Sequence, residues 1–201
     1  MKIGYFADGV WSHKTIEKIE KIADLELAFI VPRFETQDPV LKSWAKKLNI
    51  DYIPLKNVNE DHSINLLDNY KADIYVSMSF NQILKKKIIN RTKKGFINCH
   101  AGALPFYRGC NVLNWVLING ESEFGVTVHY VDEGIDTGDI ILQKKEKITD
   151  IDDYSTLLDR ASSLCANLLV DSLLNIKFSR VKIKKQNEID IIGSYCRRRV
   201  D

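Results

Sequence analysis

Two polar residues, Asn98 and His100, stand two positions apart at the end of an apolar run. The run Phe96–His100 is predicted to be a strand, and side chains two apart on a strand point to the same face. Gly102 and Pro105 follow at once, which predicts that the strand ends near His100. The pair is therefore expected at the carboxyl end of a strand, where open α/β sheets bind their ligands.

An amide beside an imidazole suits acyl-type transfer at a carbonyl carbon. When an amine attacks such a carbon, negative charge develops on the oxygen, and the NH2 group of Asn98 can donate to it. An imidazole titrates near neutrality, so His100 can exchange protons with the amine. A carboxylate would orient that imidazole, and Asp136 in the glycine-flanked run EGIDTGD is a candidate. Asp139 lies in the same run, and residue types alone do not separate the two.

Each of these residues also has a plainer interpretation. A single histidine is more often structural or solvated, and an aspartate beside glycines is more often a turn former. His129 alternates with apolar residues in a predicted strand, which favours packing over ligation. His13 and His62 lie in polar helix starts and are predicted at the surface, and Arg197–Arg199 is predicted to be part of a solvated tail.

Short apolar runs alternate with longer amphipathic runs in the first half of the chain. Strands are expected at residues 2–6, 25–31, 51–54, 73–77 and 96–100, and helices at 13–23, 39–48, 59–70 and 80–89. Ser12 is the expected N-cap of the first helix. The alternation predicts an α/β fold with right-handed crossovers, in which a Rossmann-like, mainly parallel sheet carries helices on both faces.

The second half of the chain has a different pattern. Runs 126–130 and 140–143 are close in sequence and predict an antiparallel pair of strands, and 151–175 predicts a long helix. The tail that begins at residue 177 is charged and weakly patterned. The first predicted strand lies in the run GYFADGVW, which lacks the glycine-rich signatures that cradle phosphates. The fold class alone therefore predicts no function.

Bulk composition argues against several classes of protein. The 201 residues are 45% hydrophobic and carry a formal net charge of +2, which does not predict a nucleic-acid partner. No apolar run approaches the ~20 residues that span a bilayer, and no cleavable signal is seen, so a cytoplasmic protein without membrane partners is expected. The four cysteines are widely spaced and predict neither a disulfide framework nor a zinc site.

Four motifs in one order carry a resemblance to a known family. They are Asn98-Cys99-His100, Leu104-Pro105-Phe106-Tyr107-Arg108-Gly109, Gly125-Val126-Thr127-Val128-His129 and Asp136-Thr137-Gly138-Asp139-Ile140. This combination resembles the N-x-H, LP-x-x-RG, GVT-x-H and D-x-G-x-I motifs of the formyltransferases that use N10-formyltetrahydrofolate. The strand and helix pattern before the motifs is compatible with the amino-terminal domain of that family, so the resemblance extends over nearly the whole chain.

The resemblance implies roles for particular residues. Asn98, His100 and Asp136 would be the catalytic set, which favours Asp136 over Asp139. N10-formyltetrahydrofolate would be a co-substrate, and no metal would be needed. The residues expected to bind the folate are Phe80, Gln82, Ile83, Asp132 and Glu133. Those expected to bind the second substrate are Asn81, Tyr107 and Arg108, although Arg108 is expected mainly to shape its turn.

The resemblance also implies a domain organisation and an acceptor. Residues 1–176 would form the catalytic domain, and 177–201 a tail that is either short by nature or a trimmed accessory segment. The runs Tyr107–Trp115 and Gln186–Arg199 resemble the branch that formylates nucleotide-linked amino sugars for surface polysaccharides such as lipopolysaccharide O-antigen. The partners would then be small molecules, and a homodimer stays open, as do the sugar and its nucleotide carrier.

Other acceptors and activities remain alternatives. They are formylation of glycinamide ribonucleotide in purine synthesis, hydrolysis of formyl-folate, and a folate or nucleotide sensor without enzymatic activity. The branch that formylates methionyl-tRNA carries a basic carboxy-terminal domain. It is disfavoured because no such domain is present in this sequence.

Overall fold

The computed structural model describes residues 1–198, so Arg199 and the end of the predicted tail lie outside the described residues. Within them, a seven-stranded sheet has the order β3-β2-β1-β4-β5-β7-β8. The first five strands of that order are parallel, β7 is antiparallel to β5, and β8 is antiparallel to β7. The strands are β1 (Lys2–Ala7), β2 (Glu26–Pro32), β3 (Asp51–Tyr52), β4 (Ile74–Met78), β5 (Phe96–His100), β7 (Glu123–Tyr130) and β8 (Ile140–Lys147).

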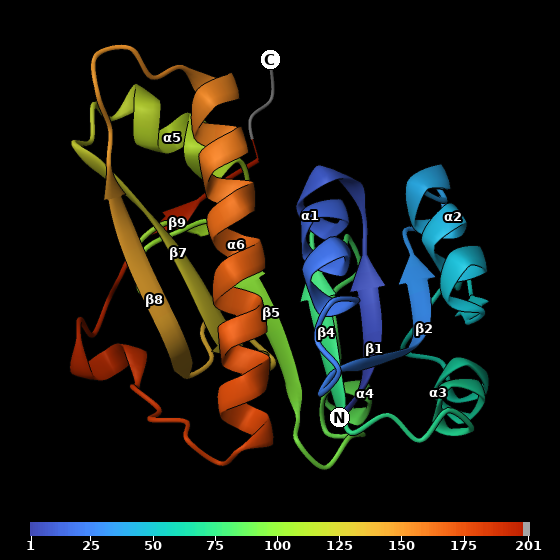
Figure 1. Ribbon diagram of the computed structural model, residues 1–201. Helices are drawn as coiled ribbons and strands as arrows, with labels where there is room; N and C mark the ends of the chain where they lie inside the picture. Colours follow the sequence, from blue (N-terminus) through green and yellow to red (C-terminus); the bar gives the residue numbers. More distant parts are fainter. Residues whose placement is uncertain (199–201) are drawn as a thin grey trace.

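Helices cover both faces of the sheet, which confirms the predicted fold class (Figure 1). One face carries α1 (Gly9–Ile19), α2 (Pro39–Leu48) and α6 (Tyr154–Lys177). The opposite face carries α3 (Asp61–Asp68) and α4 (Lys86–Ile89). The remaining helix, α5 (Val112–Ile118), packs against α6 and β7 and was not predicted.

Alternation along the strands divides the core into two layers. On β1, Ile3 and Tyr5 face the layer under α1 and α6, whereas Phe6 faces the layer under α3 and α4. Aromatic rings fill the second layer. The rings of Phe6, Phe29, Tyr75 and Phe96 have centroids 5.0–6.0 Å apart, mostly in edge-to-face contacts.

The first helix begins earlier than predicted, and Ser12 is not its N-cap. Asp8 is the N-cap, and α1 begins at Gly9, whose backbone N–H donates to Asp38 at 2.9 Å. Ser12 is buried inside the helix, where its hydroxyl donates to the Gly9 carbonyl. His13 is also not a free surface residue, because its Nε2 lies 2.7 Å from the Asp38 carboxylate.

The predicted helix over 80–89 is wrong for most of its length, since only Lys86–Ile89 is helical. Distant residues hold the preceding segment in a loop. The Gln82 side chain accepts from the Val58 N–H and donates to the Leu55 carbonyl, both at 2.9 Å. The Lys85 N–H donates to the side chain of Asn59. These tertiary bonds outweigh a local helical preference.

The long helix was predicted to begin at 151 and begins instead at Tyr154. A capping box sets this start, because the Asp153 carboxylate accepts from the Thr156 N–H and the Thr156 hydroxyl accepts from the Asp153 N–H. Among residues 1–198 no helix is both long and apolar enough to cross a bilayer.

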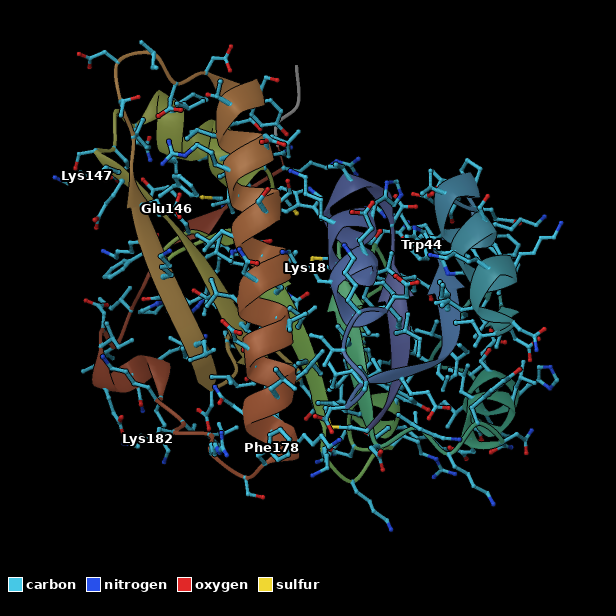
Figure 2. All side chains as sticks on the ribbon, viewed as in Figure 1. Lys18, Trp44, Glu146, Lys147, Phe178 and Lys182 are labelled. Atoms are coloured by element: carbon cyan, nitrogen blue, oxygen red, sulfur yellow. The ribbon has the colours of Figure 1, made fainter. Side chains whose placement is uncertain are left out.

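The tail folds back onto the second half of the sheet. From Phe178 at the lower end of α6, the chain passes through Lys182 towards β8 (Figure 2). It forms the short 3-10 helix η1 (Gln186–Glu188) and then β9 (Tyr195–Cys196), which pairs in parallel with β6 (Arg108–Gly109). The tail therefore lies against the Arg108–Gly109 turn.

Gly4 on β1 makes room for the aromatic layer. A Cβ atom at this position would lie 2.4 Å from the Phe29 ring and 2.7 Å from the Tyr75 ring, both of which are buried. We expect Gly4→Ala to lower the free energy of unfolding by about 1–3 kcal/mol, because the rings have no space to move. Urea denaturation measures this, with Lys42→Ala on an exposed position of α2 as the control. Equal stability of the two variants would contradict the assignment of this contact.

Candidate active site

Four polar side chains meet at the carboxyl end of β5. Asn98 and His100 lie on β5, and His129 lies on β7 directly opposite Asn98 in the antiparallel ladder. Because alternate residues share a face, these three side chains lie on the face away from α6. The shared face of Asn98 and His100 was predicted. The fourth side chain, Asp136, comes from the loop between β7 and β8.

The Asp136 carboxylate is the centre of this cluster. Its Oδ2 lies 3.5 Å from Nδ1 of His100, and its Oδ1 lies 3.5 Å from Nε2 of His129. The backbone N–H of Gly109 donates to Oδ2 at 2.9 Å, and the Asn98 amide nitrogen is 3.4 Å from Oδ1. The Asp136 side chain is 14% exposed, and those of the two histidines are 8% and 3% exposed, so the carboxylate has little contact with water.

The surroundings of Asp136 favour its ionised form. Burial alone would raise the pKa of this carboxyl. The charges of His100 and His129 and the hydrogen bonds from His129 and Gly109 act in the opposite direction and outweigh burial. The pKa of Asp136 is therefore held well below its usual value, and the group is a carboxylate at neutral pH.

Backbone carbonyls set the orientation of both imidazoles. Nε2 of His100 lies 2.6 Å from the carbonyl oxygen of Tyr107, and Nδ1 of His129 lies 2.8 Å from that of Tyr130. A carbonyl oxygen only accepts, so each of these ring nitrogens carries a proton and donates it. The other nitrogen of each ring, Nδ1 of His100 and Nε2 of His129, then faces the Asp136 carboxylate. A second proton taken up by either ring would lie between that nitrogen and the carboxylate.

The Asn98 amide is engaged within the cluster by long contacts. Its Nδ2 lies 3.2 Å from Nε2 of His129 and 3.4 Å from Oδ1 of Asp136. Both distances are at the weak end of the hydrogen-bond range. Donation to a substrate oxygen therefore requires only that one weak contact be exchanged for a shorter one.

The loop that carries Asp136 has an unusual backbone. Asp136 adopts φ +54°, a left-handed conformation that costs non-glycine residues of order 1–3 kcal/mol. Two residues later the chain passes so close to β7 that a Cβ atom on Gly138 would lie 1.8 Å from the Tyr130 carbonyl oxygen. The D-x-G spacing of the motif therefore has a steric reason: the aspartate turns the chain and the glycine lets it pass the strand.

The cluster faces a cavity of about 680 Å³, a volume typical of small-molecule sites. The cavity is lined by the loop after β4, the loop after β7, the start of α1, the segment around α5 and the tail. Residues lining it include Trp11, Arg33, Phe80, Asn81, Gln82, Ile83, Cys110, Asn114, Val131, Asp132, Tyr195 and Arg198.

Four of the five residues expected to bind folate line this cavity, namely Phe80, Gln82, Ile83 and Asp132, and Glu133 does not. Their side chains are not all free to bind. Gln82 is bonded to the backbone at 55 and 58, and Asp132 accepts from Gly134 and Thr137 within its own loop. Ile83 is 73% exposed, so an apolar surface is available there.

Of the residues expected to bind the second substrate, only Asn81 lines the cavity. The Tyr107 hydroxyl is bonded to Glu121 and Asn119, so the side chain lies over a neighbouring cavity. The Arg108 guanidinium donates to the side chain of Gln186. Arg108 thus holds its turn in place, which matches the structural role expected for it.

Two residues of the site escaped the sequence reasoning. His129 was assigned to packing, yet only 2% of it is exposed and it contacts Asp136 and Asn98. The sequence predicted no pairing between residues 96–100 and 126–130, and the register that places His129 opposite Asn98 comes from the fold. Gln186 lies in the weakly patterned tail and was not singled out as a site residue, although its amide donates to the carbonyls of Asp136 and Gly138 at 2.8 Å.

This arrangement can do acid–base chemistry on a carbonyl substrate. It offers an amide donor for a developing oxyanion and a histidine–carboxylate pair that can take up a proton. Among residues 1–198, no group of three or more His, Cys, Asp or Glu side chains is arranged to hold a metal ion.

The lowered pKa of Asp136 predicts a pH-dependent contribution to stability. The folded state binds this proton less tightly than the unfolded chain, so ionised Asp136 stabilises the fold above the usual aspartate pKa of about 3.9 and loses this effect as the pH falls. We expect the difference in unfolding free energy between the wild type and Asp136→Asn to shrink by about 1 kcal/mol from pH 5 to pH 3. Urea denaturation at both pH values measures it. Asp139→Asn, in the same loop, should show a smaller change, and an unchanged difference for Asp136→Asn would disprove the inference.

The sequence profile of the formyl transferase family matches residues 26–173. Among curated proteins, the methionyl-tRNA formyltransferase of Finegoldia magna is 35% identical over 156 residues, which cover 76% of this chain and 50% of that protein. The methionyl-tRNA formyltransferase of Fusobacterium nucleatum is 31% identical over 202 residues, which cover 94% of this chain and 63% of that protein. The chain thus spans between half and two thirds of these relatives.

Solved structures of this family share the fold. Phosphoribosylglycinamide formyltransferase from Anaplasma phagocytophilum superposes with a TM-score of 0.80 at 19% identity, covering 97% of this chain and 98% of that one. A sugar 3N-formyl transferase solved with dTDP and 5-N-formyl-THF gives a TM-score of 0.74 at 25% identity, covering 98% and 69%. Because the family profile matches more than half of its residues, this chain belongs to the formyl transferase family.

Proposed function

We propose that this chain transfers the formyl group of N10-formyltetrahydrofolate to an amine of a second substrate. The observation that carries the proposal is the convergence of Asn98, His100 and Asp136 beside one cavity. Membership of the formyl transferase family supports the same activity. A non-enzymatic sensor would have no need for an amide, an imidazole and a carboxylate around one point.

The proposed mechanism is direct transfer. The attacking amine must lose a proton, and the His100–Asp136 pair accepts it as the new C–N bond forms. Asn98 donates to the oxygen of the formyl group as negative charge develops there. The bond from the formyl carbon to the folate nitrogen then breaks, and that nitrogen takes up a proton as it leaves. No covalent intermediate with the protein is required.

For the folate we propose the side of the cavity between the loop after β4 and the loop after β7. The ring of Phe80 and the exposed side chain of Ile83 offer apolar surface to a flat ring system. Polar contacts would come mainly from the main chain, because Gln82 and Asp132 use their side chains within the protein.

For the acceptor we propose an amino sugar linked to a nucleotide, bound on the side of α1 and the tail. The solved sugar 3N-formyl transferase supports this, because its match covers 98% of this chain at 25% identity. Arg198 lines the same cavity, and a guanidinium group suits the phosphates of such a substrate.

Methionyl-tRNA is the second candidate acceptor. The curated relatives that support it are 31% and 35% identical to this chain. This chain matches 50% and 63% of the lengths of these relatives. An experiment on acceptors decides between the amino sugar and methionyl-tRNA.

Substitution of the catalytic set tests the activity itself. We expect His100→Ala and Asp136→Asn each to lower kcat by about 100-fold or more, because each removes part of the proton-accepting pair. Asp139→Asn should keep kcat within a few-fold of the wild type, since it changes a carboxylate of the same loop outside the cluster. Turnover is followed by release of tetrahydrofolate. Near-normal turnover of His100→Ala would refute the mechanism.

A panel of acceptors tests the second substrate. The protein is incubated with N10-formyltetrahydrofolate and one of dTDP-3-amino, dTDP-4-amino and UDP-4-amino sugars, methionyl-tRNA or glycinamide ribonucleotide. We expect mass spectrometry to show the gain of one formyl group on an amino sugar. Formylation of methionyl-tRNA alone would replace the first candidate by the second, and formate release without any acceptor would indicate a hydrolase.

A further inference from the structure

One side chain of the tail joins the two loops that meet at Asp136. Gln186, at the start of η1, is 4% exposed and lies fifty positions from Asp136 in the chain. Its Nε2 donates to the main-chain oxygens of Asp136 and Gly138, both at 2.8 Å. Its Oε1 accepts from the guanidinium of Arg108, at 3.1 Å from Nε and 2.7 Å from Nη2.

The two loops that Gln186 joins also meet at the carboxylate. The residue after Arg108 is Gly109, whose backbone N–H donates to Oδ2 of Asp136. Gln186 therefore closes a ring of contacts. Its amide bonds the backbone of Asp136, the Asp136 carboxylate bonds Gly109, and Arg108, the residue before Gly109, bonds Gln186. A shift of either loop breaks a bond in this ring, so the amide fixes where the carboxylate stands relative to His100.

The bonds made by Gln186 require an amide. Two carbonyl oxygens need two N–H donors, and the guanidinium needs an acceptor, and only an amide offers all of these at one side-chain end. A glutamate of the same size would keep the acceptor for Arg108 but would turn a carboxylate oxygen towards two carbonyls. A methionine would fill the same volume and make none of the four contacts.

The geometry points to Gln186 as a positioning residue for formyl transfer, an inference that rests on the proposed function. It acts through Asp136: it holds a loop whose aspartate has a costly left-handed backbone, so that the carboxylate stays between the two imidazoles. The tail would then contribute to catalysis by holding the loop that carries Asp136.

A double-mutant cycle tests this inference. We expect Gln186→Met to lower kcat about 10- to 100-fold, with KM for N10-formyltetrahydrofolate little changed, because a small displacement of a catalytic group is costly. In the Asp136→Asn background the same substitution should change kcat less than threefold, since the residue acts through that carboxylate. Asn187→Ala, at the exposed neighbouring position of η1, is the control and should behave as the wild type.

Gln186→Glu serves if the methionine variant fails to fold, because it keeps the volume and the acceptor for Arg108. It should also lose at least 10-fold in kcat. Normal kcat in the folded Gln186 variants, with kcat of Asp136→Asn lowered as expected, would overturn the inference. So would an equal loss in both backgrounds, which indicates a purely structural role. A wild type that formylates nothing in the acceptor panel refutes the proposed function, and the inference falls with it.

Discussion

The rest of the site depends on the contacts made by the partly buried carboxylate of Asp136. A carboxylate that has lost most of its contact with water is unfavourable unless partners compensate, and here two imidazoles and the Gly109 N–H do so. The same partners keep the carboxylate ionised, and the ionised form can stabilise a proton on His100. Placing this one charge correctly explains why two strands, two loops and the tail converge at a single point.

The convergence has a cost in backbone strain. The residues with left-handed backbone include Ser79, Tyr107, Asn111 and Asp136, which lie on or beside the segments around the cavity. Such conformations persist only where surrounding contacts determine them. At Asp136 the contacts are visible: Gln186 bonds the carbonyls of the loop, and Gly138 permits its close passage over β7.

Much of the fold could be predicted from the chain because its signals are local. Short apolar runs marked the main strands, and the apolar positions of α2 gave its bounds correctly. The errors lie where distant residues decide. Residues 80–85 have a helical pattern but are held in a loop by hydrogen bonds between the Gln82 side-chain amide and the segment before α3. No local pattern contains that information.

The sequence by itself determined the α/β fold, the shared face of Asn98 and His100, and the motif that contains Asp136. Those follow from periodicity and residue type, which act over a few positions. The tertiary structure alone decided that Asp136 stands between two histidines and that Gln186 holds its loop. Strand register and the path of the tail set those contacts, and both depend on packing between segments that lie far apart in the chain.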